Sequence, residues 1–305
     1  KTPRRQRQMC IRDRYKYSII LFFISLIALF LVPFIGVEVK GSKRWIDLFF
    51  LPRFQPIEVL KPFLIIILAT ILCDIKSNIL FKYLISIFLI SIISLLLIAQ
   101  PDIGQTLLVV FCWAVLIFTS GINIYILLAI FIAGASLLTY LIIYVPRFDY
   151  IQGRIFSFFN RETGTHNFQS DKAIESITSG GFFGKGIGEG VLKNRVPEAH
   201  TDYIISVISE EFGVVAIMLI LLLFLILIYM VFKKISFETN DKVKLILIGS
   251  ISLILMQATI HVGVNIRLFP TTGMTLPFLS YGGSSIISTS ILGGIILNLT
   301  KRKIT

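Results

Sequence analysis

Apolar runs of bilayer-crossing length recur along this 305-residue chain and constrain its fold more than any other feature. A helix needs about 20 mostly apolar residues to cross a hydrocarbon core about 30 Å thick. Apolar runs near that length occupy residues 17–35, 57–73, 83–99, 104–120, 122–145, 203–232, 243–264 and 278–299. They lack the alternation of β-barrel strands, so we predict an all-α, polytopic membrane bundle with eight transmembrane helices.

The composition excludes an ordinary soluble domain. The mean hydropathy is +0.87 and only 15% of residues are charged, whereas a soluble domain has about a quarter. The three cysteines, Cys10, Cys73 and Cys112, have the spacing of neither a metal site nor a disulfide framework. A membrane environment is therefore the expected context for folding.

The net charge of +12 would suit nucleic-acid binding, but its distribution indicates membrane topology instead. Basic residues gather at the N-terminus and at span ends, namely Arg4, Arg5, Arg7, Arg12, Arg14, Lys16, Lys76, Lys82, Lys233, Lys234, Lys242, Lys244, Lys301, Arg302 and Lys303. Eight spans threaded from a cytoplasmic N-terminus place all of these clusters on the cytoplasmic side. The same threading puts loops 36–56, 146–202 and 265–277 outside, and we expect no nucleic-acid partner.

Residues 1–14, KTPRRQRQMCIRDR, have no apolar periodicity. We expect them to be non-native or disordered and to precede a transmembrane domain at 15–305. The run at 17–35 is too long for the apolar core of a signal peptide and no small-residue cleavage site follows, so no cleavable signal peptide is expected.

Segment 36–56 is predicted to be a loop that ends in helix-breaking prolines before the second span. Glu58 and Lys61 follow, three residues apart on one face of that helix near its outer end. One interpretation is a structural ion pair. The alternative is that Lys61 faces a water-filled cavity and meets an anionic ligand, because ionisable residues within a membrane are usually functional.

A second polar break, QPDIGQT (100–106), separates two spans. Pro101 forces a turn, and Asp102 can cap the helix that follows. Capping requires neither Gln100 nor Gln105, so polar side chains at this membrane junction indicate a hydrated vestibule.

The longest polar segment, 146–202, concentrates carboxylates, histidines and basic residues at one face of the bilayer. Within it, FQSDKAIESITS (168–179) predicts an amphipathic helix with Ala173, Ile174 and Ile177 on one face. Chemistry in a chain of this kind is expected in such a loop.

The next stretch, GGFFGKGIGEG (180–190), contains six glycines, which permit close backbone approach or positive φ. It is not a P-loop, because Ser179 and Gly186 stand where that motif requires Gly and Ser or Thr. One interpretation is a backbone cradle for a phosphate beside Lys185. The alternative is a flexible surface loop.

The segment PEAHTD (197–202) places Asp202 directly before a long apolar helix. Asp202 can act as an N-terminal cap, with its carboxylate at the positive end of the helix dipole. The same position suits a general base at the membrane surface that deprotonates a sugar hydroxyl. His200 could orient a substrate, although His-x-Asp alone is a poor metal motif. The two roles of Asp202 are compatible, and the residues alone do not choose between them.

Farther on, LPFLSYGGSS (276–285) carries Pro277, Gly282 and Gly283 at the opening of the last span. This pattern predicts a broken helix start. Irregular backbone at that depth is tolerated only against protein or a wet cavity.

Five motif regions, in chain order, resemble the SEDS family of peptidoglycan glycosyltransferases. They are KGSKRWIDL with FQPIEVLKP, QPDIGQT, HNFQSDKAIESITSGGFFGKGIGEG, PEAHTDYIISVISEEFG and GMTLPFLSYGGSS. The resemblance extends from about residue 17 to about residue 300. Both NIRLFPTTGMTLPFLSYGGSS and GVEVKGSKRW are closer to the division-type members than to the elongation-type members.

Two departures from that family matter. The family has ten spans and the run at 17–35 corresponds to its third, so we expect a truncated or chimeric sequence without the first two. The family's Gln-Pro-Ser-Glu pattern is Gln55-Pro56-Ile57-Glu58 here, which removes a hydroxyl and leaves Gln55, Glu58 and Lys61 in register.

The resemblance implies polymerisation of lipid II into glycan strands at the outer face of the bacterial cytoplasmic membrane, at the division septum. The family's essential acidic residue falls on Asp202, which would deprotonate the 4-hydroxyl of the acceptor N-acetylglucosamine for attack on the anomeric carbon of the growing chain. The diphosphate leaving group needs cationic or N–H stabilisation, for which a divalent cation is an alternative to basic side chains. The candidate substrate-binding residues are Arg44, Gln55, Glu58, Lys61, Gln100, Asp102, Lys185, Arg195, Glu198, His200, Thr201 and Ser280.

Two other functions fit such a bundle. A lipid II flippase would need charged groups at several depths, whereas mid-span positions here are almost wholly apolar. A division scaffold without catalysis would tolerate Asp202→Asn. The resemblance also implies a class B penicillin-binding transpeptidase as partner, because glycan strands must be cross-linked, together with other division proteins and membrane lipid.

Overall fold

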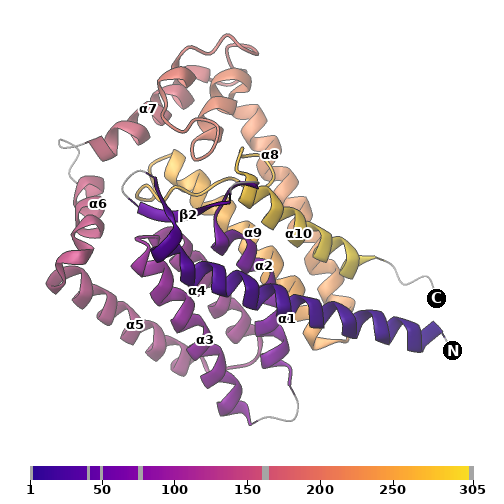
Figure 1. The fold of residues 1–305 in the computed structure, drawn as a ribbon. Helices are drawn as coiled ribbons and strands as arrows, with labels where there is room; N and C mark the ends of the chain where they lie inside the picture. The colour runs from indigo at the N-terminus through magenta and orange to yellow at the C-terminus, as the bar shows by residue number, and fades with distance from the viewer. Residues whose placement is uncertain (1–2, 40–41, 49–50, 75–77, 160–164, 302–305) are drawn as a thin grey trace. The chain divides into compact units, whose positions relative to one another are not determined.

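The computed structural model describes residues 3–39, 42–48, 51–74, 78–159 and 165–301 (Figure 1). The long helices are α1 (Pro3–Ile35), α2 (Pro56–Leu72), α3 (Ile79–Ala99), α4 (Ile103–Thr119), α5 (Ile124–Tyr144), α8 (Ile204–Phe237), α9 (Asp241–Asn265) and α10 (Gly283–Thr300). Between them lie strands β1 (Val37–Val39), β2 (Ser42–Leu48) and β3 (Leu51–Phe54), helices α6 (Asp149–Phe159) and α7 (Thr165–Gly180), and 3-10 turns η1 (Pro146–Phe148) and η2 (Leu192–Arg195).

The chain divides into two compact units. The first unit contains residues 1–120, 231–254 and 282–305, and the second contains residues 121–230 and 255–281. Helices α8 and α9 contribute residues to both units. Each unit has its own core and its own polar cluster.

Six described helices are long and apolar enough to cross a membrane, which makes this an integral membrane protein. They comprise Tyr17–Ile35 of α1, then α3, α5, α8, α9 and α10. Eight spans were expected, and the remaining two correspond to α2 and α4, which have 17 residues each. At 1.5 Å per residue such a helix is about 25 Å long, somewhat short of the hydrocarbon thickness.

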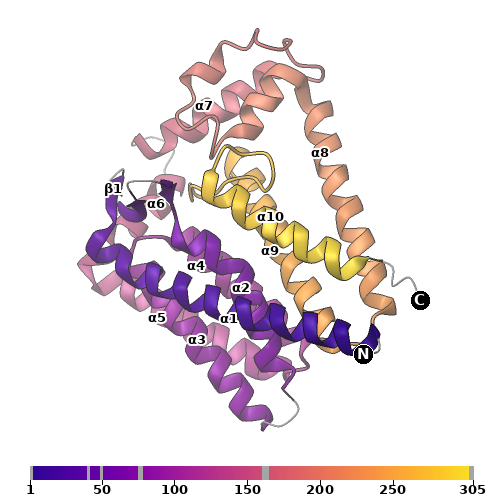
Figure 2. The same ribbon diagram turned by 45° about the vertical axis from the view of Figure 1, so that its right-hand side comes forward.

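Helix α2 forms the core of the first unit. It packs against α1, α3, α4 and α10 (Figure 2). Thirteen of its residues are buried, including Leu60, Leu68 and Ala69. A helix that is apolar nearly all round belongs inside a bundle, which explains why this short helix is so deeply buried. A Cβ atom at Gly249 of α9 would lie 2.7 Å from Cγ2 of Ile65, so glycine permits the close approach of α9.

The segment 36–56 was predicted to be a loop in an all-α chain, and this prediction is wrong in part. Its described residues form an antiparallel sheet in the order β1-β2-β3. Val37 pairs with Trp45, and Ile46 pairs with Phe54. Because strand side chains alternate between the two faces, the sheet turns Ile46 into the interior and leaves its neighbour Asp47 exposed.

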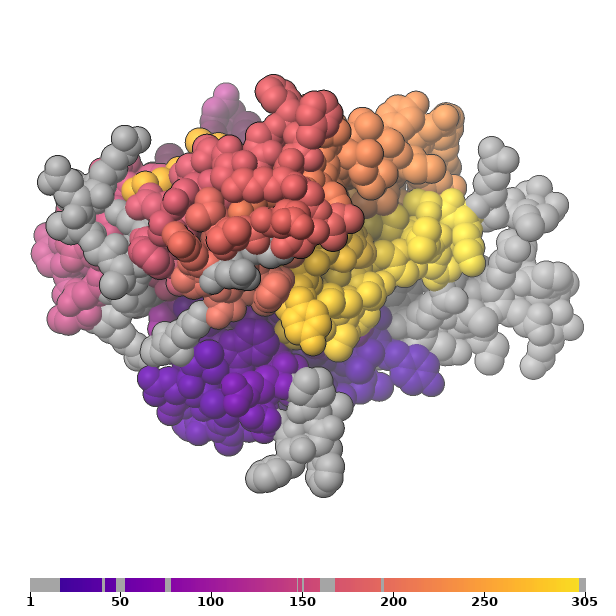
Figure 3. Space-filling view, turned by 90° about the horizontal axis from the view of Figure 1, so that it is seen from above, coloured from indigo at the N-terminus to yellow at the C-terminus, as the bar shows by residue number. Residues whose placement is uncertain are grey.

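Most of the long polar segment is helical. The helix expected at 168–179 is confirmed and extends over Thr165–Gly180 as α7, while α6 was not anticipated. Ala173 is buried as expected, but Ser176 and Gly180 complete the buried face and Ile174 and Ile177 are only half-buried. In the space-filling view, α7 and the glycine-rich segment form one continuous surface (Figure 3).

The glycines of 180–190 serve close backbone packing against the start of α8. A Cβ atom at Gly180 would lie 1.9 Å from the carbonyl oxygen of Ser209, and one at Gly184 would lie 2.2 Å from that of Glu211. Gly184 also has a positive φ of 76°. The backbone of the segment is therefore packed against α8 at Gly180 and Gly184, while most of its residues, including Phe182 and Phe183, lie exposed, as expected of a surface loop.

Helix α8 is interrupted at Gly213, where φ is 77° and ψ is −177°. A Cβ atom there would lie 2.1 Å from the carbonyl oxygen of Phe182. The apolar run 203–232 was predicted to be one span. It is instead divided by this contact, so Ile204–Phe212 forms a short helix of its own.

Gly184→Ala tests the packing of the glycine-rich segment. Both the positive φ and the clash with Glu211 oppose a methyl group, so we expect the free energy of unfolding to fall by more than about 2 kcal/mol. Gly134→Ala in α5 is the matched control, because a Cβ atom there meets nothing within 4 Å. Urea unfolding in mild detergent measures both variants, and equal effects would contradict the packing described here.

Candidate active site

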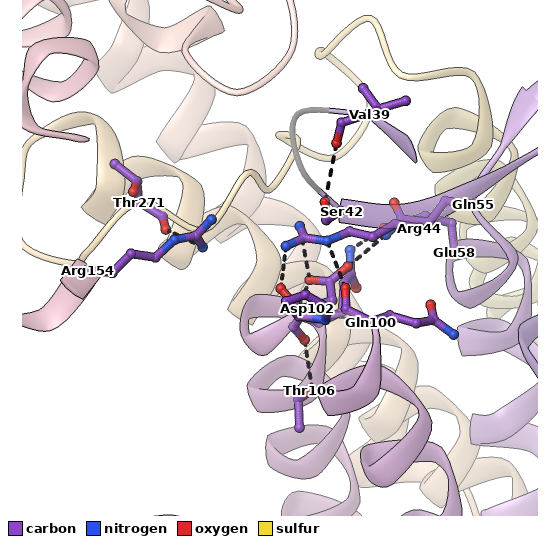
Figure 4. A network of polar contacts seen from close by, with 12 residues as sticks. Val39, Ser42, Arg44, Gln55, Glu58, Gln100, Asp102, Thr106, Arg154 and Thr271 are labelled. Carbon is purple, nitrogen blue, oxygen red and sulfur yellow. Dashed lines mark hydrogen bonds and ion pairs between the residues drawn. The ribbon is translucent and has the colours of Figure 1, made fainter. Parts of the chain in front are cut away.

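The first unit holds a buried polar cluster at the N-terminal end of α2, which we call the α2 cluster. It brings together candidates from β2, α2 and the turn between α3 and α4 (Figure 4). Its members are Arg44, Gln55, Glu58, Lys61, Gln100, Asp102 and Gln105. Six of these seven residues were candidates from the sequence, and the exception is Gln105.

Asp102 joins three segments of the α2 cluster. Its carboxylate accepts a hydrogen bond from Nε2 of Gln55 at 2.9 Å and caps α4 by accepting from the Gln105 N–H at 3.4 Å, which confirms the expected cap. Nη1 of Arg44 lies 3.8 Å from Oδ1 of Asp102. Burial raises the pKa of Asp102 above its ordinary value, while the Arg44 guanidinium and the Gln105 N–H oppose that rise.

Arg44 also fixes the sheet to the turn before α4. Its Nε donates to the carbonyl oxygen of Gln100 at 3.2 Å, and its Nη2 donates to that of Pro101. The side chain of Gln100 in turn donates to the carbonyl oxygen of Leu29 at 2.9 Å. Arg44 and Gln100 thus bond to backbone carbonyls at this junction.

Glu58 and Lys61 form the expected ion pair, with Nζ and Oε2 2.8 Å apart. Gln105 bridges them, because its Nε2 donates to Glu58 at 2.6 Å and its Oε1 accepts from Lys61 at 3.2 Å. The side chains of Lys61 and Glu58 are 0% and 3% exposed, so Lys61 is enclosed by protein in this structure and does not face water. Two polar residues one helical turn apart, Asp102 and Gln105, were the sequence signal for this bridge.

Lys61→Met tests the buried pair. It leaves the Glu58 carboxylate buried without its cation, so we expect the free energy of unfolding to fall by about 3–5 kcal/mol. The double variant Glu58→Gln/Lys61→Met removes both charges and should recover most of that loss. Lys244→Met is the control, because its pair with the exposed Asp241 is worth less than about 1 kcal/mol. Urea unfolding in detergent compares the three variants, and a double variant no more stable than Lys61→Met would contradict the pairing.

The second unit holds the Asp202 turn, residues 198–203, which leads into α8. The carbonyl oxygen of Glu198 accepts hydrogen bonds from the N–H groups of Thr201, Asp202 and Tyr203 at 3.1, 3.1 and 3.3 Å. Glu198 has a positive φ of 56°, and its carboxylate accepts from Oγ1 of Thr201 at 2.9 Å. Asp202 was expected directly before the helix. The structure places Tyr203 between Asp202 and Ile204, the first residue of α8.

Ser280 holds the Asp202 turn against the segment that follows α9. Its hydroxyl donates to the carbonyl oxygen of Thr201 at 2.6 Å and accepts from the Leu276 N–H at 2.8 Å. The Tyr281 N–H donates to the carbonyl oxygen of His200 at 2.9 Å. Leu276, Ser280 and Tyr281 belong to the stretch 276–285, for which a broken helix start was predicted. The helix α10 begins only at Gly283.

Three polar residues of α9 complete this support and were missed by sequence reasoning. Asn265 donates to the carbonyl oxygen of Asp202 at 3.1 Å, His261 Nδ1 donates to that of Met274 at 2.7 Å, and Gln257 donates to that of Thr275 at 3.0 Å. Residues 257, 261 and 265 are spaced by four, so they share one helix face. This spacing of polar residues in an apolar run was the signal that could have found them.

The Asp202 carboxylate lies half-buried beside glycine and tyrosine. A Cβ atom at Gly273, where φ is 68°, would lie 3.4 Å from Oδ2 of Asp202, at van der Waals contact, so Gly273 borders this carboxylate. Burial raises the pKa of the Tyr203 hydroxyl to about 12, so this neighbour stays protonated at neutral pH. His200 is exposed and Thr201 is half-buried.

Lys185 and Arg195 lie elsewhere in the second unit. Nζ of Lys185 is 3.7 Å from Oε1 of Glu210, a fully buried carboxylate that also accepts from the Leu192 N–H and the Ser176 hydroxyl. The N–H groups of Lys185 and Gly186 donate to the carbonyl oxygens of Glu210 and Glu211. Backbone amides proposed as a phosphate cradle are therefore engaged with α8, and Arg195 is exposed at the end of η2.

All candidates except Lys185 and Arg195 thus form two clusters, one in each unit. The α2 cluster contains those numbered 44–102, and the Asp202 turn contains Glu198, His200, Thr201 and Asp202, with Ser280 bonded to it. Within the described residues, no three His, Cys, Asp or Glu side chains are grouped so that they could hold a metal ion.

Ser280→Ala tests the support of the Asp202 turn. It leaves the buried Leu276 N–H and the Thr201 carbonyl without their partner, so the free energy of unfolding should fall by about 1–3 kcal/mol. Ser136→Ala in α5 removes an exposed hydroxyl bonded only within its own helix and should change stability by less than about 0.5 kcal/mol. Thermal unfolding in detergent separates the two, and equal losses would contradict the role given to Ser280.

The chain is similar to known proteins along nearly its whole length. The chain matches the family model for FtsW, RodA and SpoVE, described as cell cycle proteins, over residues 7–304. It is 32% identical over 299 residues to the probable peptidoglycan glycosyltransferase FtsW of Caulobacter vibrioides, covering 96% of this chain and 74% of that protein.

Solved structures agree with this likeness. One solved structure is described as the structural coordination of polymerization and crosslinking by a peptidoglycan synthase complex. It matches with a TM-score of 0.78 at 28% identity, and the match covers 95% of this chain and 82% of the chain in that structure. The crystal structure of the rod shape determining protein RodA of Thermus thermophilus matches with a TM-score of 0.68 at 28% identity, covering 96% of this chain and 81% of its own.

Proposed function

The chain belongs to the FtsW, RodA and SpoVE family of cell cycle proteins, and from that membership we propose its reaction. It is a peptidoglycan glycosyltransferase, as its FtsW relatives are named. We propose that it polymerises lipid II into glycan strands at the outer face of the cytoplasmic membrane during septal cell-wall synthesis.

The main support for the proposed chemistry is the structure of the Asp202 turn. Its backbone is held by Ser280, Tyr281 and Asn265, while its carboxylate stays half-buried beside Gly273. A general base must be positioned firmly and still be reachable by substrate. Asp202 meets both conditions.

In the proposed reaction, Asp202 removes the proton of the acceptor's 4-hydroxyl as the oxygen attacks the anomeric carbon of the growing chain. The bond between that carbon and the lipid diphosphate breaks, and the diphosphate leaves with the electron pair. General-base assistance of this kind typically contributes about 10²–10⁴-fold in rate. The Tyr203 hydroxyl lies buried near this residue, and its pKa of about 12 leaves it neutral at the pH of the reaction.

The number of membrane spans and the side on which the polar segments lie are also part of the proposal. We place α2 and α4 across the membrane as short spans that complete a set of eight, with the β-sheet, residues 146–202 and residues 266–281 outside. The polar α2 cluster at the outer end of α2 and the start of α4 supports this placement, because ionisable groups are costly at the bilayer centre.

We propose a class B penicillin-binding transpeptidase as partner. The support is the matching synthase complex, which is described as coordinating polymerization and crosslinking. Septal location is proposed from the division-type relatives. A flippase and a non-catalytic scaffold remain as the alternatives that the assay below separates.

Asp202→Asn is the test of the proposed function. Purified protein with its transpeptidase partner is supplied with labelled lipid II, and glycan products are separated on gels. We expect the variant to lose about 10²–10⁴-fold in rate, because the amide cannot accept the proton. Glu175→Gln on α7 is the control, because it removes an exposed carboxylate paired only at the surface and should retain activity.

Each alternative has its own result. Equal product from Asp202→Asn and the unmodified chain would place the base at another residue. No product from the unmodified chain, together with lipid II transfer across vesicles, would support the flippase. Division supported in cells by Asp202→Asn would support the scaffold.

A further inference from the structure

A small pocket in the second unit is lined by residues that the proposed reaction does not use. Its walls are formed by Arg154, Ser157 and Phe158 of α6, Ser170 of α7, and Arg267 and Thr271 after α9. The pocket is small and partly open to the surface, with about 10 Å³ of space for the centre of a water-sized molecule. Sites for drug-sized ligands begin at about 300 Å³, so only a small polar group, partly exposed at the surface, suits this one.

The pocket offers hydrogen-bond donors with positive charge. Nη1 of Arg154 donates to the carbonyl oxygen of Thr271 at 3.3 Å (Figure 4), and Nη1 of Arg267 pairs with Oδ1 of Asp171. Nη2 of Arg267 is buried and has no hydrogen-bond partner among the described residues. None of the described lining residues is acidic. A buried guanidinium N–H without a partner is costly, and an anion in the pocket would satisfy it.

Arg267 occupies an unusual backbone position for a long basic residue. Its φ is 58°, in the left-handed region that favours glycine. The Asp171 carboxylate pairs with Nη1 of this guanidinium, and Nη2 has no partner among the described residues. A strained residue that lines a pocket and carries a buried donor without a partner among the described residues indicates a ligand.

The pocket adjoins the Asp202 turn. Ser170 and Arg154, two of its lining residues, lie close enough to the Tyr203 hydroxyl to affect its ionisation, as does Asp202. Thr271 lies two residues before Gly273, which borders the Asp202 carboxylate. A group bound between the two arginines would therefore lie in the neighbourhood of the proposed base.

We propose that the pocket of Arg154 and Arg267 binds a phosphate group. Guanidinium groups bind phosphate through paired, charge-assisted N–H donors, and the two serine hydroxyls add neutral donors. The phosphate can belong to the diphosphate of a polyprenyl-linked sugar or to the headgroup of an anionic membrane lipid. The first identification rests on the proposed function, and the second does not.

Binding measurements on the purified 305-residue chain in non-ionic detergent test this site. The probes are farnesyl diphosphate and short-chain phosphatidylglycerol, with farnesol as the uncharged control, and affinities come from isothermal titration calorimetry. We expect Arg154→Gln and Arg267→Gly each to weaken at least one phosphate probe by about tenfold or more, without changing farnesol binding. Arg267→Gly suits the positive φ, so a folding defect should not obscure its result.

Lys172→Gln is the matched control, because it removes a basic residue of α7 that is paired with Glu175 at the surface. It should leave all affinities unchanged. Weakening confined to farnesyl diphosphate assigns the site to the substrate's diphosphate, and weakening confined to phosphatidylglycerol assigns it to a lipid headgroup. Unchanged affinities for both probes in both arginine variants would overturn the proposal.

The lipid II assay keeps this result separate from the proposed function. If the unmodified chain polymerises lipid II and the arginine variants keep their phosphate affinities, the phosphate site is contradicted and the proposed function is not. If the unmodified chain does not polymerise lipid II and the arginine variants bind the phosphate probes more weakly, the proposed function is contradicted and the phosphate site is not.

Discussion

The hydrocarbon layer supplies no hydrogen-bond partner, and this constraint decides where the polar side chains of the chain lie. In the first unit Glu58, Lys61 and Gln105 bond to one another near the N-terminal end of α2. In the second unit the buried Glu210 carboxylate accepts from a serine hydroxyl and a backbone N–H. These polar groups are thus bonded in clusters that join segments distant in sequence.

The need for polar groups to find partners within the protein also explains how the proposed base is held in place. The segment after α9 has irregular backbone, and its carbonyl and N–H groups must find partners within the protein. Side chains of α9 and Ser280 supply several of them and bind the Asp202 turn in doing so. The regular helix α9 therefore holds the Asp202 turn in position through one polar face.

Close backbone packing is the second organising feature. The glycine-rich segment lies against the start of α8, and the contact between Phe182 and Gly213 interrupts the helix. Nothing in the apolar run 203–232 predicts that break, because hydropathy is continuous across it. The glycines themselves were recognisable, but only the packed structure shows which backbone each one approaches.

Several features followed from the sequence alone because they depend on local pattern. Hydropathy over a window identifies a membrane protein and the positions of most of its long helices, and helical periodicity identified α7. Capping chemistry identified Asp102 at the start of α4, and the position of Asp202 before an apolar run singled it out as a candidate base.

Tertiary structure alone decided which distant residues meet. Arg44 lies 58 residues before Asp102, and Asp202 lies 63 residues before Asn265, so neither contact has a local signature. The sheet at 37–54, the bridging role of Gln105, the face of α9 and the pocket of Arg154 and Arg267 belong to the same class. Hydrogen bonds act over about 3 Å, and only the packing of helices brings such groups within that distance.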